Sequence, residues 1–256
     1  MGKYFTVEVK PTIPNVAAGQ HAAFANNDVL WDWYAFDIPK GTHKLINATM
    51  EVRPKGDAGS TVNEYSIDIL FAKSVNGTAP TSIGTSNSGA FGSAVNLSNN
   101  LVGYIPQANW KFETHSDSTA FAMTNNNPGD ARIANPHFLL FGEPESGTNV
   151  GYDKLYIAGI AAAASDFTSL VRINNGTLDG DTFTVDGLDP RLTFAVGDVI
   201  AATTTADTSV SKSLGTIKSM PDANTIVLET TTENAILNDD FIYNTAPIKI
   251  ELQFER

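Results

Sequence analysis

Pro247-Ile248-Lys249-Ile250-Glu251-Leu252-Gln253-Phe254-Glu255 is the stretch that decides how this chain is organised. Apolar and polar side chains alternate through it without a break, which is the period of a β-strand with one buried and one solvated face. A terminal segment of this kind needs a sheet to pair with. We therefore expect it to return to a sheet that begins much earlier in the sequence.

The stretch before it has the pattern of a separate small β unit. Val196-Gly197-Asp198-Val199-Ile200 predicts a tight turn that leads into a strand, because glycine accepts a positive φ and aspartate bonds the following backbone. Residues 214–220 and 225–229 alternate on either side of a turn at 221–224. The sequence thus predicts a small antiparallel barrel or sheet over residues 166–245, inserted into a domain of residues 1–165 plus 246–256.

The remaining sequence predicts an all-β fold. Forty-two per cent of the 256 residues are apolar, and frequent Gly, Pro, Ser, Thr and Asn interrupt every helical periodicity. The chain has no apolar run of about 18 residues, so we expect no membrane partner. Strand-like patterns favour a β-sandwich or jelly roll, and cover residues 4–9, 31–38, 44–53, 65–72, 110–114, 137–141 and 154–161. Two polar stretches, 74–100 and 116–135, are interpreted as exposed arms or binding loops.

Charge and cysteine content exclude several classes of function. The net charge is −12, which repels phosphate backbones and makes nucleic acid an unfavourable partner. Residues 166–245 carry 4 basic and 12 acidic side chains and hence −8 of this charge. Either this segment forms a solvated outer surface or its loops are merely acidic. The absence of cysteine excludes disulfides and thiol chemistry.

No pattern predicts a catalytic or metal centre. The four histidines, at positions 21, 43, 115 and 137, lack zinc or triad spacing, and His43 and His137 are interpreted as structural hydrogen-bonding groups. Asp179 and Asp181, with Asp186 and Asp189 nearby, are candidate calcium ligands, but no glutamate closes the loop. The alternative is that Asp179-Gly180 forms a two-residue hairpin turn. We expect no cofactor, no metal and no enzymatic activity.

A group of aromatic residues offers the best candidate contacts. Trp31, Trp33 and Tyr34 lie among the carboxylates Asp28, Asp32 and Asp37, a mixture that fits a sugar groove or a glycosidase. The alternative is a half-buried strand with Trp31, Trp33 and Ala35 on one face and Phe36 on the other, which serves as core or subunit contact. The full candidate set for subunit or glycan contact is Trp31, Trp33, Tyr34, Phe91 and Trp110.

Several segments together resemble structural proteins of tailed bacteriophages, especially marine ones. The resemblance covers roughly residues 150–256 and is carried by Asp153-Lys154-Leu155-Tyr156-Ile157-Ala158-Gly159-Ile160, Phe194-Ala195-Val196-Gly197-Asp198-Val199-Ile200, Gly215-Thr216-Ile217 and Asn238-Asp239-Asp240-Phe241-Ile242-Tyr243. Phe36-Asp37-Ile38-Pro39-Lys40-Gly41-Thr42 looks like the β-rich domain that such proteins use for anchoring. The resemblance implies a virion component and provides no catalytic residues.

These observations predict a capsid decoration protein on the outer surface of the virion head. Its partners would be the major capsid protein and copies of itself, as a homo-oligomer such as a trimer at a threefold axis. The alternative is a tail-fibre or baseplate-associated protein that binds host surface polysaccharide through its aromatic residues.

Overall fold

The architecture was obtained as a computed structural model. It describes residues 3–13, 24–53, 66–84, 100–107, 110–113, 120–124, 138–144, 151–165, 167, 169–174, 180–203, 211–232 and 236–256.

The first sheet is antiparallel and is organised around the C-terminal strand. Its order is β1 (Tyr4–Val9), β16 (Ile248–Glu255), β3 (Thr42–Val52), β7 (Ala120–Thr124) and β6 (Trp110–Glu113), with β8 (Phe138–Phe141) also paired to β3. Ile248, Ile250, Leu252 and Phe254 are fully buried. Each such side chain contributes about 1.5–3 kcal/mol by leaving water, so the last strand is a major part of the core.

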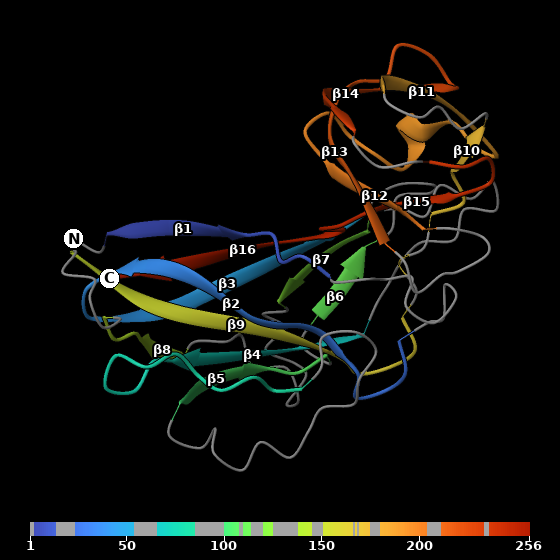
Figure 1. The fold of residues 1–256 in the computed structure, drawn as a ribbon. Coiled ribbons are helices and arrows are strands. Elements are labelled where there is room, and N and C mark those ends of the chain that lie inside the picture. Colours follow the sequence, from blue (N-terminus) through green and yellow to red (C-terminus); the bar gives the residue numbers. More distant parts are fainter. Residues whose placement is uncertain are drawn as a thin grey trace.

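The second sheet closes the sandwich from the other side. Its order is β2 (Val29–Pro39), β9 (Tyr152–Ala161), β4 (Ile67–Lys73) and β5 (Leu101–Ile105), again antiparallel. The inner faces of both sheets share one hydrophobic core, to which Ile67, Ile69 and Phe71 of β4 contribute as their alternation predicts. Figure 1 shows the two layers, with both termini at one end.

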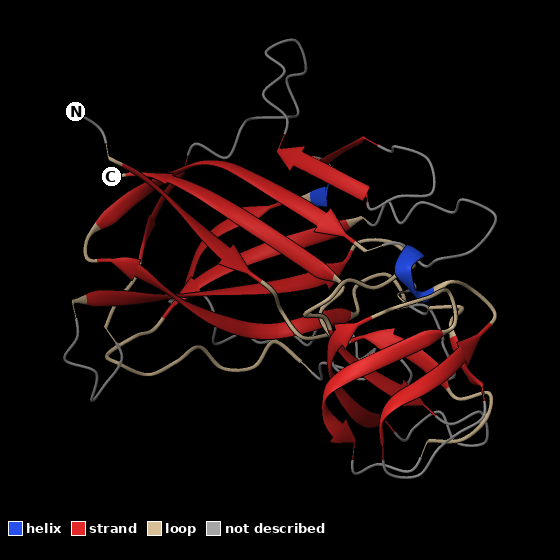
Figure 2. Ribbon diagram, turned by 90° about the horizontal axis from the view of Figure 1, so that it is seen from above, coloured by secondary structure: helices blue, strands red, loops and turns tan. Residues whose placement is uncertain are grey.

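The chain leaves the sandwich after β9 and forms a closed barrel before it returns as β16. The barrel order is β10 (Arg172–Asn174), β11 (Gly180–Asp186), β14 (Thr225–Thr232), β13 (Ser211–Ser219), β12 (Val199–Thr203) and β15 (Phe241–Asn244). A 3-10 helix over Pro190–Leu192 lies between β11 and β12. The barrel has its own core of buried aliphatic and phenylalanine side chains. It projects from the end of the sandwich opposite the termini (Figures 1 and 2).

The predicted fold class is therefore confirmed: a β-sandwich with a small β-barrel inserted before the last strand. The strand predicted over residues 4–9 coincides with β1. β5 is not predicted by the sequence pattern, and β7 lies inside the 116–135 stretch that was interpreted as a loop. The boundaries placed at residues 165 and 245 stay a prediction.

The division of faces predicted for β2 is wrong, because a bulge shifts the alternation. Trp31 pairs with Gly159 and Tyr34 with Ile157, so β2 advances three residues while β9 advances two. The extra residue in β2 forms a β-bulge. As a result Trp31 and Phe36, predicted on opposite faces, are both buried in the shared core. The bulge turns Trp31 inward.

The first part of the predicted arm at 74–100 is also not an exposed loop. Ser74 and Ile83 are fully buried, and Ile83 packs with Val29, Ala158 and Ile160 in a second small cluster that belongs to the sandwich. Residues 74–84 thus cover part of a sheet instead of extending into solvent.

Candidate functional site: the aromatic strand and the barrel junction

Trp31 is part of the core and is enclosed by the strand next to it. Its side chain is 2% exposed, and its indole nitrogen has no hydrogen-bond partner. A Cβ built on Gly159 would lie 2.3 Å from two carbons of the indole ring, so the ring rests directly on the glycine backbone. Trp31 therefore has no exposed surface on which a sugar ring could stack. It is a core residue, as the alternative interpretation of this strand expects.

Asp32 and Trp33 hold the segment that follows β4. The Asp32 carboxylate accepts from the backbone N–H groups of Trp33, at 2.8 Å, and Ile83, at 3.2 Å. The Trp33 indole donates to the carbonyl of Thr81 at 2.8 Å. Asp32 and Trp33 of β2 thus hold residues 74–84 against the sheet.

The other candidate aromatic residues are dispersed. Trp110 is 7% exposed and belongs to the sandwich core, whereas Tyr34 is 37% exposed on the surface of β2. Phe91 lies outside the described residues. The structure thus does not bring the described members of the set together on one surface.

The acidic residues near β2 also make separate structural contacts. Asp28 accepts the backbone N–H of Ala25 at 2.7 Å, and Asp37 forms an ion pair with Lys154 at 2.6 Å. The paired-carboxylate hypothesis gains no support from these contacts.

Two alternatives were open for residues 179–189, a calcium site and a hairpin turn. Both include Asp179, which lies outside the described residues. Asp181 accepts from the hydroxyl of Thr182, and Asp189 is bound by Arg191, whose hydrogen bond lowers the pKa of that carboxyl. Within the described ranges no three His, Asp or Glu side chains are placed to hold a metal ion.

The hairpin turn predicted at Asp179-Gly180 includes Asp179 and therefore stays a prediction. Gly180 is the first residue of β11 and pairs with Thr232. β10 and β11 on either side of the predicted turn are antiparallel neighbours, with Asn174 paired to Thr184.

His43 matches its interpretation as a structural hydrogen-bonding residue. It is 1% exposed, and its Nε2 lies 2.8 Å from the carbonyl oxygen of Pro39. Its ring packs edge-on against Phe5, 5.0 Å between centroids. His137 lies outside the described residues.

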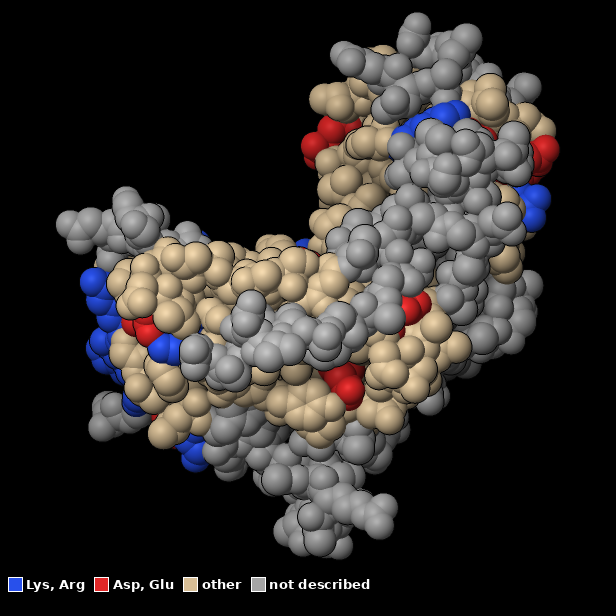
Figure 3. All heavy atoms as spheres, turned by 60° about the horizontal axis from the view of Figure 1, so that its bottom comes forward, with Lys and Arg blue, Asp and Glu red and all other residues tan. Residues whose placement is uncertain are grey.

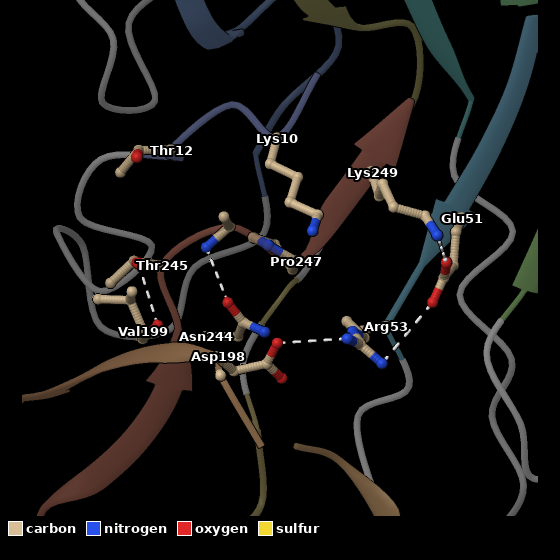
Figure 4. A pocket seen from close by; sticks show the side chains of 12 residues that line it. Lys10, Thr12, Glu51, Arg53, Asp198, Val199, Asn244, Thr245, Pro247 and Lys249 are labelled. Atoms are coloured by element: carbon tan, nitrogen blue, oxygen red, sulfur yellow. Dashed lines mark hydrogen bonds and ion pairs between the residues drawn. The ribbon is translucent and has the colours of Figure 1, made fainter. Parts of the chain in front are cut away.

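A cavity lies where the barrel joins the sandwich. It has a volume of about 360 Å³ and is lined from the sandwich by Glu51 and Arg53 of the β3 end, and from the barrel by the Asp198 turn and Asn244. Figure 4 shows these side chains converging from the two units. Arg53 bridges them, because it lies 3.2 Å from Asp198 and 3.6 Å from Glu51.

The charges around this cavity are neutralised by one another. Lys249 lies 2.7 Å from Glu51, and this hydrogen bond raises the pKa of the lysine above its usual value. Asp198 also accepts the backbone N–H of Ala195 at 2.8 Å, within the turn where Gly197 has a φ of 90°. A backbone hydrogen bond also crosses the same junction, from the N–H of Ile13 to the carbonyl of Thr245 at 2.9 Å. The arrangement fixes the barrel on the sandwich.

Sequence reasoning identified the Val196–Ile200 turn but not the role of its carboxylate. Asp198 and Arg53 are 145 residues apart, and no local pattern joins them.

In the described part of the chain, no helix has the length and apolar character needed to cross a membrane. No protein-family model, curated protein or solved structure significantly matches this chain.

Proposed function

We propose that the chain is a non-enzymatic virion structural protein of a tailed bacteriophage, a decoration protein on the outer surface of the capsid. The observation that carries the proposal is the division of the molecule into a broad β-sandwich and an acidic barrel at one end of it (Figure 2). The sandwich supplies an anchoring surface and the barrel a solvated projection.

The distribution of charge supports this division. Residues 166–245, which contain all six barrel strands, carry −8 of the net charge of −12. Like-charged projections repel one another and keep decorated particles from adhering. The junction at Arg53 and Asp198 holds the projection in place, because an ion pair supported by the backbone hydrogen bond from Ile13 to Thr245 limits rotation.

The mechanism is binding alone. A protein that binds the assembled shell and not its separate subunits stabilises the shell by mass action. Copies of the sandwich contact the major capsid protein and one another around a symmetry axis, so that many modest contacts act together.

The test is to mix the purified protein with phage heads assembled without it. We expect a saturable number of bound copies per head and a higher temperature of thermal rupture. Heads that bind no copies, or that bind copies without any change in rupture temperature, would contradict the proposal. The size-exclusion mass of the free protein tests the expected homo-oligomer.

The alternative, a tail protein that binds host polysaccharide, now depends on Tyr34, which is exposed beside Trp33. If the alternative is correct, binding on a glycan array should be lost in Tyr34→Ala.

A further inference from the structure

The end of the sandwich that carries the chain termini has a surface unlike the rest of the molecule. We call it the terminal face, and define it by three exposed apolar or aromatic side chains and three cations: Tyr4, Leu139, Phe141, Lys3, Lys44 and Arg256. Lys and Arg side chains, with Asp or Glu beside some of them, lie at this end, at the left of Figure 3, opposite the barrel. The sequence did not single out these residues.

Strand pairing places the members of the terminal face side by side. Tyr4 of β1 pairs with Glu255 of β16, Glu255 with Lys44 of β3, and Lys44 with Leu139 of β8. Neighbouring strands lie about 4.8 Å apart, so this row spans about 14 Å. The row therefore presents a tyrosine and a leucine at its two ends with a lysine between them.

The flanking residues extend the row on both sides. The backbone N–H of Arg256 donates to the carbonyl of Lys3 at 2.9 Å, which brings these two cations next to Tyr4. Phe141 follows Leu139 by two residues on β8, which places both side chains on one face of the strand. The terminal face thus extends beyond the row, to Lys3 and Arg256 next to Tyr4 and to Phe141 next to Leu139.

The apolar and aromatic side chains of the terminal face expose much of their surface to water, which is energetically unfavourable. Tyr4 is 68% exposed, Leu139 62% and Phe141 42%. Single exposed apolar residues are ordinary, but a group on adjacent strands is typical of a contact surface.

The cations of the terminal face have no acidic partner among the residues that the structure describes. Lys3, Lys44 and Arg256 make no ion pair with any residue of the described ranges, unlike Lys10, Lys154 and Lys249 of the same sandwich. The three cations of the terminal face, Lys44 in the row and Lys3 and Arg256 beyond it, outnumber the one carboxylate of the row, Glu255, in a chain whose net charge is −12. A partner that is itself acidic would neutralise this charge.

We propose that the terminal face docks the sandwich on an acidic, partly apolar protein surface of the capsid shell. This inference rests on the proposed function and identifies the surface through which the chain would bind the capsid. Docking here leaves the barrel, at the opposite end, clear of the shell (Figure 1). The barrel of a second copy is the other acidic candidate, but two chains that each carry −12 repel one another, and a head-to-tail contact would form open filaments.

The experiment uses two variants of the terminal face, Lys44→Glu and Leu139→Ala, with two controls on the barrel. Lys218→Glu reverses an exposed cation and Leu192→Ala truncates a leucine that is 53% exposed, so each control matches one variant in chemistry. Binding to heads assembled without this chain is measured at about 50 mM and about 500 mM salt, where the Debye length falls about threefold. Thermal melting of each variant checks that it is folded.

We expect each terminal-face variant to bind heads about tenfold more weakly, and each barrel control to bind as the unmodified protein does. The loss in Lys44→Glu should shrink at the higher salt concentration, whereas the loss in Leu139→Ala should persist. If the unmodified protein binds heads and both variants bind equally well, the terminal face is not the docking surface although the proposed function stands. If the unmodified protein does not bind, the proposed function fails and the inference with it. Filaments of free protein that Lys44→Glu disperses would assign the face to a second copy and overturn the proposal.

Discussion

Gly159 has almost no room for a side chain, because the indole ring of Trp31 lies directly against its backbone. In Gly159→Ala the added Cβ would lie 2.3 Å from the indole, where an ordinary contact needs at least 3.4 Å, so the ring must retreat by about 1.1 Å. Trp31 is 2% exposed and packs within the sandwich core. Overpacking of this kind costs about 1–3 kcal/mol. We expect Gly159→Ala to lower the free energy of unfolding by this amount.

A double-mutant cycle tests the reason for this loss. Trp31→Leu alone leaves a cavity and should cost about 2–4 kcal/mol. The smaller side chain accepts the new methyl group, so the double variant should cost at least about 1 kcal/mol less than the sum of the two. The assay is urea unfolding followed by circular dichroism. Gly151→Ala is the control, because its added Cβ meets no atom within 4 Å. Strict additivity, or a Gly159→Ala protein as stable as the original, would refute the packing argument.

Three further changes probe the last strand, the barrel core and the barrel surface. Phe254→Ala removes a buried ring that stacks on β1, so it should destabilise the sandwich by about 3–5 kcal/mol while barrel amides keep their protection in hydrogen exchange. Asp240→Ala leaves the Lys212 ammonium, which lies 3.1 Å from the Asp240 carboxylate, buried without its partner. It should lower the free energy of unfolding by about 3–5 kcal/mol and shift the unfolding midpoint to a lower urea concentration. Arg191→Gln should raise the pKa of Asp189 toward its ordinary value in a carbon-13 NMR titration. Because the pKa of Asp189 is lowered in the folded protein, the ionised carboxylate contributes a small stabilisation at pH values above its unfolded pKa of about 3.9. This stabilisation is lost as the pH falls through the folded pKa. In Arg191→Gln, the free energy of unfolding should no longer depend on pH in this range through Asp189.

Alternation predicted the strands whose two faces differ most. β1 and β16 read as strands because every second side chain enters the core, and β16 is buried at four alternate positions. The same signal is weak in β7, whose five residues lie in a stretch rich in Ser and Asn. Short strands of this kind depend on their neighbours for stability, so propensity alone does not reveal them.

The sequence could not reveal features that depend on two strands at once. The bulge in β2 changes which residues face inward, and it is visible only in the pairing with β9. Arg53 and Asp198 meet because the barrel joins the sandwich at the end where β3 finishes. The terminal face is likewise assembled from β1, β3, β8 and β16, so no single stretch of sequence contains it.

The orientation of the chain on an intact particle is the most direct test of the account. A cryo-electron microscopy map of the particle should show the sandwich against the outer surface of the head, with β1 and β8 toward the shell and the barrel pointing into solvent. Density for the chain at the tail tip, or on the head with its barrel against the shell, would contradict the account.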